Sequence, residues 1–163
     1  MTESFTVRDA KKSDLSQMVT LSSEKRLAYE KAEPQFWKRS VNADELQLEW
    51  FNKILEDKNH ILLVGLIKNK IEGFIIGNLI LAPSVYNPGG LTLMIDDFCV
   101  RTSLLWNSLG RDLLKEIKNR GKNNQAVQVL VVAGHHDKEK IDFLKKVKLS
   151  VVSEWYIGNI DGA

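Results

Sequence analysis

The order of apolar segments along the chain narrows its fold more than any other feature. Residues 60–67 and 71–81 are apolar stretches of strand length, and the polar tripeptide Lys68-Asn69-Lys70 between them predicts an antiparallel hairpin. Further strands are predicted at residues 5–7, 91–100, 127–133 and 149–157. With the helical patterns included, the order is strand, two helices, three strands, helix, strand, helix, strand. This order predicts an α/β fold with one mixed, mostly antiparallel sheet and helices on both faces.

The second half of the chain has the clearest patterns. Leu109, Leu113, Leu114 and Ile117 recur at helical spacing, which predicts an amphipathic helix that starts near residue 107. Residues 127–133 are almost continuously apolar and β-branched, as in a strand covered on both faces. A short helix from residue 137 and a last strand at residues 149–157 complete the predicted sheet.

Size and charge exclude several classes of protein. The 163 residues suit a single domain, which we expect to span residues 1–163. A formal net charge of +2 is too small for the basic surface of a nucleic-acid-binding protein. No stretch of about 18 apolar residues predicts a membrane span, and the N-terminus has no signal-peptide pattern.

Cysteine and histidine, the usual zinc ligands, are few in this chain. Cys99 is the one cysteine, so no internal disulfide can form, and a reducing, cytoplasmic compartment is expected. The three histidines have no cysteine cluster near them, so no zinc-site spacing is present and no metal is expected.

Four segments carry a resemblance to a known family. Met94-Ile95-Asp96-Asp97-Phe98-Cys99-Val100 is an acidic strand, residues 105–110 follow it, Leu113-Leu114 is an apolar pair, and residues 143–149 end the next helix. Together with the strand order, these segments resemble the GNAT acetyltransferases. The matching family elements are the fourth strand, the pyrophosphate loop Arg/Gln-x-x-Gly-x-Gly/Ala with its apolar pair, and Phe-Tyr-x-x-x-Gly-Phe. The resemblance implies the GNAT fold, in which the strands flanking the helix from residue 107 part into a V-shaped cleft.

The resemblance also implies a site for acetyl-CoA as the donor substrate. A strand that ends at Val100 and a helix that follows would present free backbone N–H groups to a pyrophosphate. Gly110 keeps one family glycine, whereas Ser108 replaces the other and Leu105 replaces Arg/Gln. An ordinary strand–loop–helix corner is the alternative. The candidate cofactor-binding residues are Phe98, Cys99, Val100, Leu105, Trp106, Asn107, Ser108, Leu109, Gly110 and Arg111.

Candidates for the chemistry come from the same resemblance. Acetyl transfer to an amine needs a base, a polarised carbonyl and a proton source for the thiolate. Asp96 and Asp97 are adjacent and are expected to point to opposite faces of the strand. The family alignment favours Asp96 as the base, with Asp97 the alternative; a pair of strand-edge carboxylates that bind Lys or Arg is equally compatible with the sequence.

The family's proton-donating tyrosine is replaced by Leu144. Its substitutes could be Tyr156, Tyr86, His135 or His136. The acceptor pocket could be lined by two pairs of residues, Tyr86 with Asn87 and Phe36 with Trp37.

The predicted function is therefore an acetyl-CoA-dependent N-acetyltransferase that moves an acetyl group directly to an amine of a small molecule or peptide. The alternative is a catalytically inactive GNAT-like module for CoA binding or protein interaction, which Leu105, Ser108 and Leu144 favour. By analogy with the family, a homodimer is expected to be possible.

Overall fold

The sheet of the computed structural model has five strands in the order β1-β2-β3-β4-β5, and the structure describes residues 4–162. The first four strands pair antiparallel, whereas β4 and β5 pair in parallel. This confirms the predicted mixed, mostly antiparallel sheet. The strands are β1 (Phe5–Asp9), β2 (His60–Ile67), β3 (Lys70–Ile80), β4 (Leu91–Val100) and β5 (Ala126–Val131).

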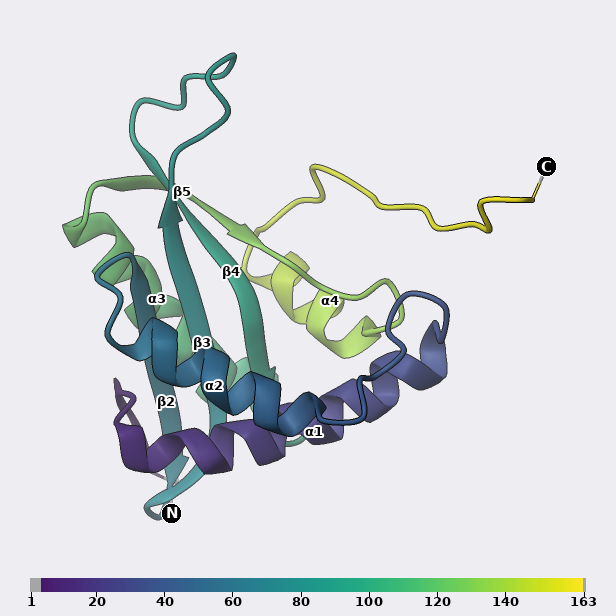
Figure 1. Cartoon of the computed structure of the whole chain (residues 1–163). Helices are drawn as coiled ribbons and strands as arrows, with labels where there is room; N and C mark the ends of the chain where they lie inside the picture. Colours follow the sequence, from purple (N-terminus) through teal and green to yellow (C-terminus); the bar gives the residue numbers. More distant parts are fainter. Residues whose placement is uncertain (1–3, 163) are drawn as a thin grey trace.

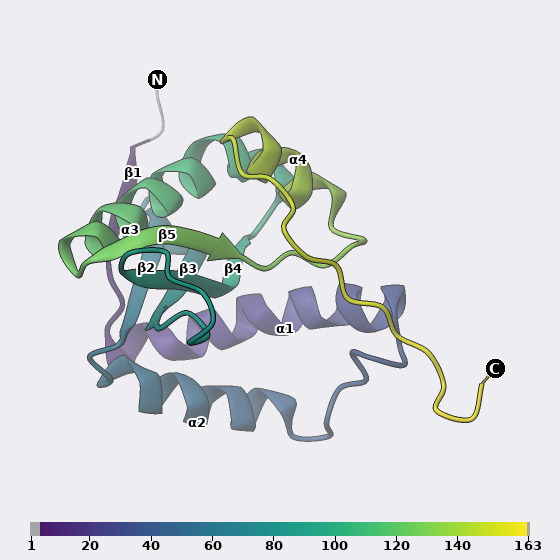
Figure 2. The same ribbon diagram turned by 90° about the horizontal axis from the view of Figure 1, so that it is seen from above.

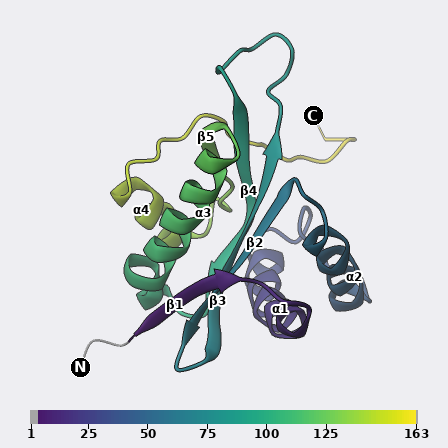
Figure 3. The ribbon, with the colours of Figure 1, turned by 90° about the vertical axis from the view of Figure 1, so that its left-hand side faces the viewer.

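Two helices lie on each face of the sheet (Figures 1 and 3). One face carries α1 (Leu15–Ala32) and α2 (Ala43–Leu55), and the other carries α3 (Arg111–Asn123) and α4 (Lys138–Lys146). The central strands therefore divide their apolar side chains between two cores. Phe74 belongs to the core under α1 and α2, and Ile75 belongs to the core under α3 and α4.

The hairpin between β2 and β3 turns at Lys68 and Asn69, whose φ angles are 50° and 65°. Ile67 pairs with Lys70, so the loop has two residues. A two-residue turn with positive φ at both positions matches the right-handed twist of the flanking strands. The predicted hairpin is confirmed.

Strand β5 differs from its prediction. It ends at Val131, and only one of its faces is covered: Ala126, Val129 and Val131 pack on the core under α3 and α4. Val127 and Leu130 are 53% and 37% exposed. The reason is the reach of the other layer, because α1 packs on β3 and β4 and α2 packs on β2. The prediction of a strand covered on both faces is therefore wrong.

The predicted last strand at residues 149–157 is also absent. Within residues 4–162 no strand follows α4, and the chain instead runs out past the end of α1 (Figures 1 and 2). The apolar residues of this segment suit a strand, but residues 150–157 are exposed in this structure, and Leu149 is half-buried against the core under α3 and α4.

Helix α4 ends in a Schellman motif centred on Lys148. The Lys148 N–H donates to the Lys145 carbonyl at 2.9 Å, and the Leu149 N–H donates to the Leu144 carbonyl at 3.0 Å. The motif requires left-handed backbone, and Lys148 has φ 64°. The GNAT pattern Phe-Tyr-x-x-x-Gly-Phe has its glycine at this position, so this chain places a side chain where glycine is favoured.

We expect Lys148→Gly to raise the free energy of unfolding by about 1 kcal/mol, because the left-handed conformation costs a non-glycine residue about 1–2 kcal/mol and glycine's own entropy offsets part of the gain. Urea unfolding followed by circular dichroism would measure the shift in midpoint. Lys148→Ala keeps the steric conflict and serves as the control. Equal midpoints for the glycine and alanine variants would contradict this account of the motif.

Candidate active site

Strands β4 and β5 part halfway along β4. Residues Leu91 to Ile95 pair with β5, and the last contact is the Val132 N–H donating to the Ile95 carbonyl at 3.0 Å. From Asp96 to Val100, β4 has no partner on the β5 side among residues 4–162, and Figure 1 shows the two strands diverging there. The parting of the strands expected from the resemblance is therefore confirmed.

A β-bulge occurs at the same point of β4. On the β3 side, Ile76 pairs with Asp97 and Gly77 pairs with Ile95, so Asp96 is an extra residue without a partner. Bulges break the regular alternation of side chains and re-aim them. Asp96 is exposed, whereas Asp97 is half-buried and precedes Cys99 by two residues on the α1 side of the strand.

Asp97 lies in an environment that disfavours its charged form. Burial raises the pKa of Asp97 above the usual range of a carboxyl, and the neighbouring Asp96 raises this pKa further. The cations Lys140 and Arg26 act in the opposite direction. A carboxylate whose pKa moves towards neutrality is suited to accept a proton.

Lys140 is the partner that sequence reasoning missed. Its side chain is 2% exposed, and its Nζ lies 5.6 Å from the centre of the Phe98 ring and 5.9 Å from that of Trp106. Burial lowers the pKa of Lys140, while Asp137, Cys99 and Asp97 oppose this shift. The signal was in the spacing, because residues 140, 143, 144 and 147 follow the i, i+3, i+4, i+7 pattern of a buried helix face.

An aromatic wall lies where the end of α1 meets the loop that precedes α4. Tyr29 at the end of α1 lies 4.4 Å from His136 and 4.9 Å from Trp37, measured between ring centres. Burial raises the pKa of Tyr29 to about 12, and the nearby Asp137 carboxylate adds to the shift. Of the two candidate histidines, His136 thus packs in this wall, and His135 is exposed.

The predicted pyrophosphate loop is helical. A 3-10 turn (Ser103–Leu105), preceded by Thr102, leads into a π-helical turn (Trp106–Gly110) and then into α3. The helical segment therefore starts earlier than the position near residue 107 that the sequence predicts. The first N–H groups of a helix have no partner within it, which places free donors at Ser103 and Leu104.

The candidate cofactor-binding residues divide into core and surface. The exposed or half-buried ones are Leu105, Asn107, Ser108 and Arg111, and the buried ones are Phe98, Cys99, Val100, Trp106, Leu109 and Gly110. The Trp106 ring stacks on Phe143 at 5.2 Å and meets Phe98 edge-on at 4.9 Å. A Cβ at Gly110 would lie 2.9 Å from the Trp106 ring, so this glycine makes room for the tryptophan.

Both candidate tyrosines are exposed. Tyr156 is 88% exposed on the segment after α4, and its hydroxyl donates to Glu154 at 2.6 Å. Tyr86 is 71% exposed in the loop between β3 and β4. Leu144, at the family's tyrosine position, is buried in the core.

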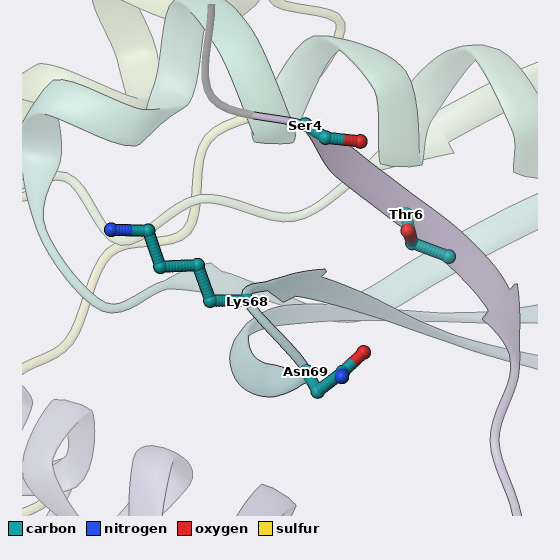
Figure 4. A pocket seen from close by; sticks show the side chains of 4 residues that line it. All are labelled: Ser4, Thr6, Lys68 and Asn69. Atoms are coloured by element: carbon teal, nitrogen blue, oxygen red, sulfur yellow. The ribbon is translucent and has the colours of Figure 1, made fainter. Parts of the chain in front are cut away.

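Two surface hollows lie elsewhere. One, of about 200 Å³, is lined by Ser4, Thr6, Lys68 and Asn69 at the β2–β3 turn (Figure 4). The other, of about 420 Å³, is lined by Ile67, Lys68, Lys70, Glu72, Thr102 and Leu105. Neither lining includes Asp97 or Lys140.

Among residues 4–162 no three His, Cys, Asp or Glu side chains gather closely enough to hold a metal ion. In that same part of the chain no helix combines the length and apolar character needed to cross a membrane.

Comparison of the sequence with protein-family models and with curated proteins gives no match. Comparison with solved structures gives full-length matches at low identity. A predicted acetyltransferase with acetyl-CoA from Clostridium acetobutylicum is 19% identical, with a TM-score of 0.73 over 96% of this chain and 97% of that one. The aminoglycoside N-acetyltransferase AAC(6')-Iy in complex with CoA is 10% identical, with a TM-score of 0.73 over 99% of this chain and 98% of that one.

A transcriptional regulator from Bacillus halodurans is 16% identical, with a TM-score of 0.71 over 96% of this chain and all of that one. At these identities the likeness concerns the fold, and proteins with different names share it. Combined with the parting of β4 from β5 and the bulge at Asp96, the comparisons show that this chain has the GNAT acetyltransferase fold.

Proposed function

We propose that the chain is an acetyl-CoA-dependent N-acetyltransferase that moves an acetyl group directly to an amine of a small molecule or peptide. The observation that carries the proposal is the parting of β4 from β5 at Ile95, next to the half-buried Asp97 and the buried Lys140. The likeness to structures that hold acetyl-CoA or CoA supports the same class of reaction.

The donor site is proposed at the start of the helical segment that leads into α3. Acetyl-CoA supplies an activated thioester when bound. Free N–H groups at Ser103 and Leu104, at the positive end of a helix dipole, suit its diphosphate. The exposed Arg111, Asn107 and the half-buried Ser108 lie on the following turns and are the side chains available to a bound nucleotide.

For the acceptor we propose Asp97 as the base, in preference to the exposed Asp96. The amine must lose a proton when its nitrogen bonds to the acetyl carbon, and a carboxylate with a raised pKa is the better acceptor for that proton near neutral pH. The wall formed by Tyr29, Trp37 and His136 is the proposed apolar side of the acceptor pocket.

Lys140 is proposed to serve the leaving group in place of the missing tyrosine. When the carbon–sulfur bond breaks, the thiolate takes up a proton, and the pKa of a thiol is about 8.5. The lowered pKa of Lys140 brings its ammonium closer to that value, so proton transfer to sulfur becomes easier than from an ordinary lysine.

Calorimetric titration with acetyl-CoA and CoA tests the donor site. We expect micromolar binding by the wild type and roughly tenfold or greater weakening in Ser103→Pro, because a hydrogen bond to a charged group contributes about 1.5–3 kcal/mol. Proline is tolerated at a first helical position, and Thr102 already has the extended backbone (φ −127°, ψ 152°) that precedes proline.

Ser103→Ala keeps the backbone donor and is the matched control, with unchanged affinity expected. Thermal unfolding of both variants checks that the fold is kept. If the wild type binds neither nucleotide up to millimolar concentration, the enzyme proposal is overturned. The catalytically inactive interaction module, which Leu144 favours, would then take its place.

A further inference from the structure

One face of helix α1 changes character along the helix. At the i, i+3, i+4, i+7 spacing of a packed face, α1 carries Leu15, Met18, Val19, Ser22, Lys25, Arg26 and Tyr29. The first four are buried and three of them are apolar, whereas the last three are half-buried and carry polar groups. Figures 1 and 2 show α1 running across the sheet towards the connection between β5 and α4. The face therefore becomes polar as the helix approaches the parting of β4 and β5.

The polar end of this face lies beside the unpaired half of β4. The Lys25 Nζ donates to the carbonyl of Arg101, the residue that follows β4, at 3.5 Å. Tyr29, one turn further along α1, belongs to the aromatic wall. Between them is Arg26, which is close enough to Asp97 for its positive charge to oppose the rise in the pKa of that carboxyl. Arg26 is thus a cation beside the proposed base to which the transfer reaction has assigned no task.

The guanidinium of Arg26 is incompletely paired. Its Nη2 donates to the Asp44 Oδ1 at 2.6 Å, and the side chains of Arg26 and Asp44 are 25% and 59% exposed. The Arg26 Nε is buried and has no hydrogen-bond acceptor among residues 4–162. A buried donor without a partner costs free energy and needs a physical explanation. An ion pair to an exposed carboxylate contributes little to stability, so Asp44 does not by itself account for the position of this arginine.

We propose that Arg26 binds a carboxylate of the acceptor, so that the substrate is an amine that also carries a carboxylate, as an amino acid does. The guanidinium has five N–H donors, which allows Arg26 to hold the substrate through Nε and to keep Asp44 through Nη2. With its carboxylate on Arg26, the substrate directs its amine towards Asp97. This inference rests on the transferase proposal and assigns a specificity-determining residue within it.

The acceptor preference of a single protein is the first test. We expect the wild-type kcat/KM for amino acids to exceed that for the corresponding amino-acid amides at least tenfold, because a carboxylate forms the stronger, charge-assisted hydrogen bond with a guanidinium. Rates are expressed per deprotonated amine, since the amide group alters the pKa of the amine. In Arg26→Met the ratio should fall to about one, mainly through a higher KM for the acids. Both substrates meet the same protein, so partial unfolding of a variant leaves the ratio unchanged.

Two further variants separate substrate binding from a structural role of Arg26. Asp44→Asn removes the carboxylate that competes for the guanidinium, so we expect it to keep or increase the preference for acids. If Arg26 only joins α1 to α2 through Asp44, this variant would instead lose the preference as Arg26→Met does. Arg120→Met is the matched control, because Arg120 is also half-buried and ion-paired, to Asp9 at 3.0 Å, but lies on α3 on the opposite face of the sheet. It should keep the wild-type ratio.

The outcomes distinguish this inference from the proposal on which it rests. A protein that fails to bind acetyl-CoA overturns the transferase proposal and the role of Arg26 with it. A protein that binds acetyl-CoA and acetylates amides or simple amines as well as acids remains a transferase, and only the carboxylate site is overturned. An equal loss of preference in Asp44→Asn and Arg26→Met would also overturn that site.

Discussion

We expect Asp97→Asn to acetylate amines with a kcat/KM about 10²–10³-fold below that of the wild type, the usual range for the loss of a positioned base. Acetyl-CoA affinity should change little, because the proposed donor contacts lie at Ser103 and Leu104. Steady-state kinetics with an amine identified by screening, together with calorimetry for the donor, would separate the two effects.

The pH profile adds a signature that misfolding cannot imitate. The base acts when deprotonated, so wild-type kcat/KM should fall as the pH drops through the raised pKa of Asp97, above the range of an ordinary carboxyl. Asp97→Asn should lose this limb of the profile. Its free energy of unfolding at neutral pH should not fall, because the substitution removes a charge that burial disfavours.

Asp96→Asn is the matched control for this prediction. Asp96 is adjacent in sequence but exposed, and we expect its variant to keep kcat/KM within about threefold of the wild type, since surface substitutions away from bonded groups have small effects. If the large loss instead appears in Asp96→Asn and not in Asp97→Asn, the bulge presents Asp96 to the amine, and the assignment is reversed.

The difference between these two carboxylates shows where sequence reasoning stops. Adjacent residues on a strand point to opposite faces, so that rule left both carboxylates as candidates, and only the family resemblance favoured Asp96 over Asp97. The choice depends on the bulge, which arises from the register of β4 against β3. Register is a property of the paired strands, so the segment 91–100 alone does not contain it.

The same limit explains the errors at the C-terminal end. The apolar residues in 149–157 suit a strand, but a strand needs a partner, and only the assembled fold shows whether the segment pairs with one. By contrast, the β2–β3 hairpin was predictable because Lys68 and Asn69 make a local turn. The helix from Leu109 to Ile117 was predictable because its pattern is periodic.

The burial of Lys140 was only partly predictable from the sequence. The helix spacing that predicts burial for Phe143 and Leu144 predicts it for Lys140 as well, but a lysine on an apolar face is usually expected to extend its ammonium to water. The structure instead holds Nζ over the rings of Phe98 and Trp106, beside the parted strands. A buried cation at this place is an energetic cost, and such costs are often retained at functional sites.

Lys140→Met tests both the energetic cost of burying this cation and its proposed role as a proton donor. At pH 7 we expect the free energy of unfolding to rise by about 1–2 kcal/mol, because an apolar side chain of similar volume replaces a buried charge. The pKa of Lys140 is lowered even though Asp97 and Asp137 attract its ammonium, so their attraction is already included in this expectation. In the same variant, kcat should fall about 10²-fold, as for loss of a positioned proton donor.

The pH dependence of stability distinguishes a lysine with a lowered pKa from an ordinary lysine. In the unfolded chain lysine keeps its proton up to about pH 10.4, whereas the folded chain releases it at lower pH, so the unfolded state binds more protons in between. Wild-type stability therefore rises with pH across this window, and the advantage of Lys140→Met shrinks and closes at its upper end. Urea unfolding of both proteins at pH 7 and pH 10 measures the difference, with the exposed Lys145→Met as control. A gain that is equal at both pH values, with full activity, would mean that Lys140 keeps the pKa of an ordinary lysine in the folded chain and that the proton reaches the thiolate from another source.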